Sequence, residues 1–495
     1  LGRFTGLVRD GESQIDNSRD DRTYLAPAVT WRPSSATELT VLARYNDTRA
    51  FPAQSGPIVG TVEPNPNGSI EPDFLSGDPN VEEFDTEDTA LSYHLEHAFS
   101  DRVRLRQKAR LNNVEVDYKT VFPFGSLEAD QRTQPRASFA VDGEADRLVV
   151  DTQLHLEHGS GPLTNKAVFG VDVSHDETEE VRRFGSATPI DVFDPDRSGN
   201  SILTLPVTSD RDIEETNVGV YVSDELTVSE RWVISGGLRY DQVDTEIDDN
   251  LAGTTDDSDD DETTGRIGLT YRSALGLHPY VSYAESFEPQ SGTLADGSEA
   301  EPLEGEQYEA GLKYRPEGFE GLFTLAGFRI EQSNRLVNTP TGNVQRGEFE
   351  VEGLEAEARA ELASGWRVIG AATYLDTEIT EGDNAGNETT QTPDRQLSIW
   401  LGRRFDGDSP LAGLDAGIGY RYVGETWADE ANTLEIDSYE VVDASLKYSV
   451  RPGLDVELEA NNLFDEEFVA TCFPGFGSCF FGDTRSVTAS VRYSW

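Results

Sequence analysis

The sequence of 495 residues contains no methionine, and it begins at Leu1 inside a stretch that alternates like a β-strand. Because translation starts at methionine, we expect the chain to be a fragment that has lost its N-terminal part. Any export signal would lie in that part, so the lack of one here carries no information.

Long apolar runs are also missing. Hydrophobic residues make up 36% of the chain, mean hydropathy is −0.51, and there is no run of about 18 apolar residues, which excludes membrane-spanning helices. A membrane β-barrel stays open as an interpretation, because only alternate residues of its strands meet lipid. Neither a Pro/Ser-rich linker nor a charge boundary divides the chain, so residues 1–495 are predicted to form one domain.

Basic residues and cysteines are scarce. Forty Lys and Arg face 93 Asp and Glu, which gives a formal net charge of −53. This charge argues against nucleic acid as a partner, because phosphates would be repelled. The two cysteines, Cys472 and Cys479, lie in a segment rich in Gly, Phe and Pro. A disulfide formed in an oxidising compartment fits this spacing, and a metal-binding pair is the alternative, although no other ligand cluster accompanies it.

Alternation with a period of two dominates the rest of the sequence. In residues 484–495, for example, Val487, Val491 and Tyr493 share one face, and Thr488 and Arg492 share the other. Most such segments are about ten residues or longer, as tilted membrane strands require, whereas strands of soluble domains average about 5–6 residues. Twenty strands are predicted: 2–11, 20–32, 36–48, 86–99, 102–117, 131–159, 164–177, 214–228, 231–245, 262–273, 277–287, 304–315, 320–336, 347–361, 365–379, 391–406, 412–424, 437–450, 453–466 and 484–495.

The connections between these segments alternate in length. Short turns alternate with long polar loops along the chain, which is typical of outer-membrane barrels. The long loops are predicted at 49–85, 178–213, 246–261, 288–303, 380–390 and 467–483. Trp31, Trp232, Trp366 and Trp495 each fall at a short-turn end, where an interfacial aromatic girdle would lie. The predicted fold class is therefore all-β, an antiparallel transmembrane β-barrel. Such barrels have even strand numbers, and a barrel of about 22 strands encloses a lumen that must be plugged.

Several phrases near the C-terminus and along the whole chain carry a family resemblance. They include Asn461-Asn-Leu-Phe-Asp-Glu-Glu-Phe468, Cys472-Phe-Pro-Gly-Phe-Gly-Ser-Cys479, Ser282-Tyr-Ala-Glu-Ser-Phe-Glu-Pro289, Gly305-Glu-Gln-Tyr-Glu-Ala-Gly-Leu-Lys-Tyr314 and Val351-Glu-Gly-Leu-Glu-Ala-Glu357. In this order they resemble TonB-dependent siderophore receptors, above all the ferrichrome (hydroxamate) branch.

This resemblance implies a barrel of 22 strands, an N-terminal plug domain and a TonB box that reaches TonB in the periplasm. About 20 strands would be present here, with the plug and the first two or so strands missing. The implied protein sits in the outer membrane of a Gram-negative bacterium, surrounded by lipid, and we expect a monomer. It would import a ferric siderophore, with the iron held by the siderophore, so neither a cofactor nor enzymatic activity is expected.

The resemblance also indicates ligand contacts. Phe122 and Phe124 stand where the family places two aromatic contacts, Phe184 stands at another, and Phe473 matches one in the last loop. Flat aromatic faces suit a bulky and only partly polar ferric hydroxamate. The alternative is that these aromatics merely pack the loops together. Two positions depart from the family: residues 53–55 lack its Tyr and Trp, and Ser186 replaces an aromatic. Cys472 and Cys479 would clip the loop that carries Phe473.

Two groups of possible metal ligands receive a simpler interpretation. The acidic segment Asp241–Glu262 could attract Ca²⁺, but it lacks the ligand spacing of an EF-hand, and a solvated surface loop is expected. In the pairs His94/His97 and His155/His158, residues three apart on a strand point to opposite faces, so neither pair can chelate one ion. No metal site is predicted.

Two other functions stay open at this stage. The same fold could import cobalamin, haem or another metallophore, although haem would predict histidines in the long loops, and all six lie in or at strands. The second alternative is a passive porin-like barrel, which would need no plug.

Overall fold

The structure is a computed structural model that describes the chain except for residues 16–17, 291–293, 297, 299, 340–341, 347–348, 408–409 and 495. Twenty strands form one antiparallel sheet. Its members are β1 (Gly2–Arg9), β2 (Asp20–Ser34), β3 (Thr37–Ala50), β5 (Glu83–Ser100), β6 (Val103–Pro123), β7 (Thr133–Ser160), β8 (Leu163–Asp191), β9 (Val207–Val228), β10 (Trp232–Asp249), β11 (Thr254–Tyr271), β12 (Leu277–Glu288), β13 (Leu303–Tyr314), β14 (Glu320–Ser333), β17 (Phe349–Leu362), β18 (Trp366–Ile379), β19 (Arg395–Arg404), β20 (Leu414–Val423), β23 (Tyr439–Arg451), β24 (Leu454–Asn461) and β27 (Ser486–Tyr493).

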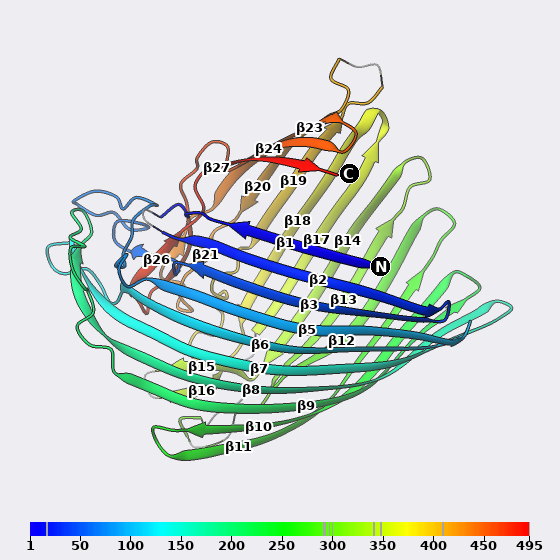
Figure 1. Ribbon diagram of the computed structural model, residues 1–495, viewed down its shortest axis with the longest axis horizontal. Coiled ribbons are helices and arrows are strands. Elements are labelled where there is room, and N and C mark those ends of the chain that lie inside the picture. Colours follow the sequence, from blue (N-terminus) through cyan, green and yellow to red (C-terminus); the bar gives the residue numbers. More distant parts are fainter. Residues whose placement is uncertain are drawn as a thin grey trace.

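Each strand of this sheet pairs with the next one along the chain. The predicted antiparallel barrel with twenty strands is therefore confirmed. Within the described part of the chain no pairing joins β1 to β27, so the wall has one seam (Figure 1). The missing plug and the two or so missing strands stay predictions.

Shorter elements lie between the strands of the barrel. They are β4 (Gly56–Pro57), β15 (Arg335–Thr339), β16 (Gly342–Arg346), the 3-10 turn η1 (Ala363–Gly365), β21 (Thr426–Trp427), β22 (Glu435–Ile436), β25 (Val469–Phe473) and β26 (Ser478–Phe481). No helix among the described residues is long and apolar enough to cross a membrane.

The two ends of the barrel differ as the connection lengths predicted. Short connections such as residues 35–36, 161–162 and η1 gather at one end, called here the turn end. The long connections and β4, β21 and β26 gather at the other, called the loop end (Figure 1). In outer-membrane barrels the long loops face the outside of the cell.

Period-two alternation places apolar side chains on the outer face of the wall. Along β17, Leu354 points outward and is 58% exposed, while Glu355 and Glu357 on the inner face lie near Tyr280 of β12. Tyr314 and Phe323 meet toward the turn end with ring centroids 6.1 Å apart. Tyr283 and Tyr308 meet nearer the loop end at 4.9 Å. Two aromatic belts with an apolar band between them are the pattern of a barrel that spans a membrane.

Three of the four girdle tryptophans lie where the sequence placed them. Trp232 and Trp366 begin β10 and β18 directly after short turns, and Trp31 is 60% exposed near the end of β2. Trp495 lies outside the described residues. Trp400 instead points into the lumen, where its ring covers Gly417 and Gly419 of β20.

Two predicted long loops are partly strand. The segment 178–213 continues β8 as far as Asp191 and resumes in β9 at Val207. The acidic segment Asp241–Glu262 was predicted as a loop, and that prediction is wrong. It forms the paired ends of β10 and β11, joined by the turn at residues 250–253, with Asp244 opposite Asp259. Continuous pairing of β10 with β9 supplies the backbone partners that make the extension possible.

Buried apolar clusters lie at the loop end rather than in the lumen. One consists of Ala428, Ile436, Cys472 and Cys479, and a second of Val81, Val121 and Ala187. Both join long loops to each other or to the wall. The loop end is therefore packed enough to hold side chains in fixed positions, which a binding site requires.

Candidate ligand-binding site

An aromatic pocket of about 360 Å³ opens inside the barrel at the loop end. Its wall side comes from β6, β7 and β8, and its other side comes from the last long loop together with Ala53 and Ser55 of the loop after β3. The lining residues are Ala53, Ser55, Tyr118, Thr120, Phe122, Phe139, Phe184, Phe473, Phe476, Ser478 and Phe480. We call this cavity the aromatic pocket.

Strand register explains the wall side. On β6, Tyr118, Thr120 and Phe122 share the inward face, because residues two apart point the same way. Thr120 pairs with Phe139 of β7, and Phe139 pairs with Phe184 of β8. The three strands therefore carry their rings on one inner surface.

The structure brings the four predicted contact residues together. Phe122, Phe184 and Phe473 line the pocket. Phe124 is not among the lining residues, but its ring lies 6.2 Å from that of Phe122 and 5.5 Å from that of Phe184. The rings meet edge to face, the geometry in which aromatic pairs attract. Whether these residues touch a ligand stays a prediction.

Phe476 was not among the contacts predicted from the sequence. Its ring lies 6.1 Å from Phe122 and 6.3 Å from Phe124, so it closes the cluster from the loop side. Phe139 was not singled out at all. Phe139 faces the lumen like Phe122 and Phe184, and this could have been predicted once the β6–β7 register was known.

Backbone pairing holds the last loop over the pocket. Cys472 and Cys479 form a disulfide and pair directly across β25 and β26. Strand β26 pairs in turn with β4 of the loop at residues 51–82. At Gly477, with φ +71°, a Cβ would lie 2.6 Å from the carbonyl oxygen of Gly125, so only glycine permits this close approach.

Asn462 fixes both legs of the same loop. Its side chain donates to the carbonyl oxygens of Glu466 and Asp483 at 2.8 and 3.1 Å and accepts from the Glu466 amide at 2.8 Å. The residue has φ +48°, which asparagine tolerates better than most residues. The Asn-Asn-Leu-Phe phrase of the resemblance therefore contains a structural clamp.

Buried charges anchor the loop at residues 51–82. Arg136 of β7, 5% exposed, donates to the carbonyl oxygens of Ser76, Gly77 and Thr188 at 2.8 to 3.0 Å. Glu82 accepts from the amides of Asp78 and Val121 and from the hydroxyl of Thr120. Burial raises the pKa of Glu82, although these hydrogen bonds oppose the shift.

Of the two departures from the family pattern, one lies at the aromatic pocket and the other does not. Ala53 and Ser55 line the aromatic pocket, so the loss of Tyr and Trp there leaves open space in it. Ser186 does not line the pocket. Its hydroxyl instead lies 3.1 Å from that of Thr204.

A second cavity of about 1060 Å³ lies beside the aromatic pocket and shares Ala53 and Phe480 with it. We call it the polar cavity. Arg421, Asp443, Asn461, Asn462 and Ser486 contribute from the wall and the strand ends, and the remaining polar residues come from the loops. Arg421 pairs with Asp443 at 3.0 Å.

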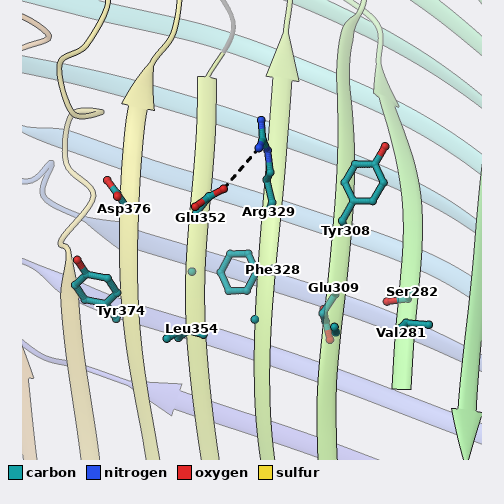
Figure 2. Close-up of a pocket in the computed structure, with 13 residues that line it drawn as sticks. Val281, Ser282, Tyr308, Glu309, Phe328, Arg329, Glu352, Leu354, Tyr374 and Asp376 are labelled. Carbon is teal, nitrogen blue, oxygen red and sulfur yellow. Dashed lines mark ion pairs between the residues drawn. The ribbon is translucent and has the colours of Figure 1, made fainter. Parts of the chain in front are cut away.

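A groove of about 660 Å³ lies on the opposite surface of the wall, across β12, β13, β14, β17 and β18 (Figure 2). Its side chains Val281, Tyr308 and Leu354 belong to the outward apolar face. Arg329 pairs there with Glu352 at 3.6 Å (Figure 2), and it also pairs with Glu331 and Glu350 at 2.7 and 2.8 Å. Because this groove faces away from the lumen, it is not part of the candidate site.

The possible metal ligands lie as follows. His94 and His97 are on β5, and His155 and His158 are on β7, so each pair has the strand placement that the sequence argument assumed. Among the described residues, no group of three or more His, Cys, Asp or Glu side chains is arranged to hold a metal ion.

The fold and the pocket at the loop end of its lumen define an outer-membrane β-barrel receptor. The family described as "TonB dependent receptor-like, beta-barrel" matches residues 20–463. The chain belongs to this family. Its members are receptors and transporters of the Gram-negative outer membrane, not enzymes.

Comparison with individual proteins gives relatives and a solved structure of similar sequence or fold. The ferrichrome outer membrane transporter/phage receptor of Escherichia coli strain K12 is 34% identical, with 99% of this chain and 70% of that protein covered. The ferrioxamine B receptor of Salmonella typhimurium is 30% identical, with 100% and 71% covered. The crystal structure of the ferric-catecholate import receptor Fiu from E. coli, in its closed form, superposes with a TM-score of 0.88 at 20% identity, covering 100% of this chain and 77% of that one.

Proposed function

We propose that this chain is the barrel of an outer-membrane receptor that imports ferric siderophores of the hydroxamate type, energised through TonB. The observation that carries the cargo class is the aromatic pocket, because its lining is mostly aromatic and none of its described lining residues is charged. The two relatives named for hydroxamate complexes support the same class. The iron arrives inside its chelator, so the barrel need not supply metal ligands.

Charge distinguishes hydroxamates from catecholates. A ferric complex of singly charged hydroxamates is neutral overall, whereas a ferric complex of doubly charged catecholates keeps a large negative charge. Among the described residues that line the aromatic pocket, none carries a positive charge. A chain with net charge −53 would also repel an anionic complex, most strongly at low salt.

TonB would engage the receptor through its N-terminal region, outside this chain. The barrel would act as a monomer whose outer face contacts lipid directly, since exposed apolar positions such as Leu354 and Val281 occupy that face. Siderophore binding at the loop end would precede passage through the lumen to the periplasm.

Binding by the full-length receptor tests this proposal. Phe122→Ala and Phe184→Ala should each weaken a ferric trihydroxamate by about tenfold, because burying a Phe side chain is worth about 1.5–3 kcal/mol. Phe99→Ala is the matched control, since Phe99 is 63% exposed at the turn end. Unchanged affinity in both pocket variants, or tighter binding of a ferric catecholate than of any trihydroxamate, would overturn the proposal.

A further inference from the structure

Arg403 is an arginine on the outer face of the wall at the turn end of the barrel. Trp400 points into the lumen, so the residues of β19 at odd positions point outward. They include Ile399, Leu401 and Arg403, and the two apolar side chains are 42% and 39% exposed. Arg403 pairs with Trp366, the first residue of β18 after the short turn η1. The outer face of β19 therefore changes from apolar to cationic where the wall reaches the periplasmic surface of the membrane.

Two aromatic rings hold the Arg403 guanidinium. Its Cζ lies 5.0 Å from the ring centroid of Trp366 and 4.7 Å from that of Phe405, close enough for cation–π attraction. Phe405 is itself held by the β19–β20 connection. Its amide donates to the carbonyl oxygen of Leu414 at 2.8 Å, and its carbonyl oxygen accepts from the amide of Gly413 at 2.9 Å. A guanidinium held against rings in this way can still donate hydrogen bonds from its edge.

This guanidinium lacks an anionic partner within the described part of the chain. None of the described carboxylates forms an ion pair with Arg403, and its Nε is buried without a hydrogen-bond acceptor. Arg329, which faces outward near the loop end, pairs instead with Glu331, Glu350 and Glu352. A buried donor without an acceptor is costly, and this chain has 93 acidic residues for 40 basic ones. An acceptor from outside the chain would satisfy the Arg403 guanidinium.

We propose that Arg403, Trp366 and Phe405 bind the phosphodiester group of a membrane phospholipid. The short turns of outer-membrane barrels face the periplasm, so the outer face at this height meets the phospholipid headgroups of the periplasmic leaflet. Arginine suits a phosphodiester, because its planar fork donates two parallel hydrogen bonds to phosphate oxygens. The acyl chains then lie along Leu401 and Ile399 toward the middle of the bilayer. This site is independent of the cargo of the receptor.

Three lipids with the same acyl chains test the proposal. Phosphatidylethanolamine and phosphatidylglycerol carry the phosphodiester, whereas diacylglycerol lacks it. Each is titrated into the full-length receptor in detergent, and native mass spectrometry measures the affinity of the most tightly bound molecule. Both phospholipids should bind about tenfold more tightly than diacylglycerol, as expected from a hydrogen bond to a charged group. Glycerophosphate, which has no acyl chains, should not displace them at the same concentration.

Variants locate the effect. In Arg403→Gln, both phospholipids should bind no more tightly than diacylglycerol. Arg404→Gln is the matched control, because it removes the same charge from the next residue, which faces the lumen, and it should keep the full preference. The double variant Trp366→Leu with Phe405→Leu retains the cation without its rings, and its preference should fall to about threefold. Each variant should keep the resistance of the folded barrel to detergent, which shows that the fold is intact.

The outcomes separate this site from general attraction of lipid. Equal binding of phospholipids and diacylglycerol by the unaltered receptor overturns the proposal, and so does a full preference in Arg403→Gln. An equal loss of preference in Arg403→Gln and Arg404→Gln would assign the effect to the net charge of the barrel. Displacement by glycerophosphate would make this a site for free anions and contradict a lipid ligand. Siderophore import is untouched by each of these results, since its site lies at the loop end.

Discussion

Gln14 and Thr484 are 470 positions apart in the sequence, and the backbone amide of Thr484 donates to the side-chain oxygen of Gln14 at 2.8 Å. The same side chain donates to the carbonyl oxygen of Gly482 at 3.3 Å. One glutamine therefore ties the loop after β1 to the loop before β27, at the loop end of the only seam in the described sheet.

Loss of this tie should loosen the last loop. In Gln14→Ala, hydrogen exchange at the Thr484 amide should be faster by about tenfold, since a hydrogen bond contributes about 0.5–1.5 kcal/mol and the opening is local. Gln14→Glu is the control, because it keeps the acceptor for Thr484 and loses only the donor to Gly482. Equal exchange in the alanine variant and the unaltered receptor would show that the contact does not order the loop.

The disulfide should matter for binding more than for the barrel. Replacing Cys472 and Cys479 together by serine removes a constraint worth about 2 kcal/mol for so short a loop, and Phe473 and Phe476 lie within it. Ferric trihydroxamate affinity should fall by about tenfold, while resistance of the folded barrel to detergent and heat should stay the same. Reduction of the unaltered receptor should reproduce the loss. A double serine variant that binds normally would show that β25–β26 pairing alone holds these rings.

The barrel could be predicted because its signals are local. Period-two alternation marks each strand, and connection lengths mark the two ends, so each strand needs only its own residues to be recognised. The prediction failed at Asp241–Glu262, where composition outweighed pattern. Dense carboxylates suggested a loop, yet Val243 and Ile247 keep the alternation, and pairing with β9 extends β10 to Asp249.

The candidate site was predicted only in part, for a different reason. The resemblance indicated Phe122, Phe184 and Phe473, and the structure brings them into one pocket. Phe139 was not predicted, because its position in the pocket depends on the β6–β7 register, which cannot be read from a short stretch of sequence. The polar cavity was not predicted either. Glu12 and Asp483 line the same cavity only because the sheet curves and brings its two edge strands near each other.

The ring of Trp400 limits what β20 can carry on its inner face. A Cβ added at Gly417 would lie 2.3 Å from a ring carbon of Trp400, so Gly417→Ala should displace the ring and destabilise the barrel by about 1–3 kcal/mol. Urea unfolding in detergent would measure this change. Gly318→Ala is the control, because a Cβ there meets nothing within 4 Å.

A second substitution separates this steric effect from a backbone effect. In a Trp400→Leu background, Gly417→Ala should cost less than it does beside the intact ring, because the atoms that it would meet are gone. An equal cost in both backgrounds would contradict the steric explanation.

Acidity should strengthen the anchoring of the loop at residues 51–82. Burial raises the folded-state pKa of Glu82 above its unfolded value, against the opposing hydrogen bonds of Thr120, Val121 and Asp78. Protonation of Glu82 therefore adds to the free energy of unfolding. This contribution is complete below the unfolded pKa and is lost as pH rises through the folded pKa. Protection of the Val121 amide, corrected for intrinsic exchange at each pH, should decline over that window. Glu82→Gln should remove this decline, since the amide does not titrate. Parallel curves for the variant and the unaltered receptor would assign the pH dependence to another group.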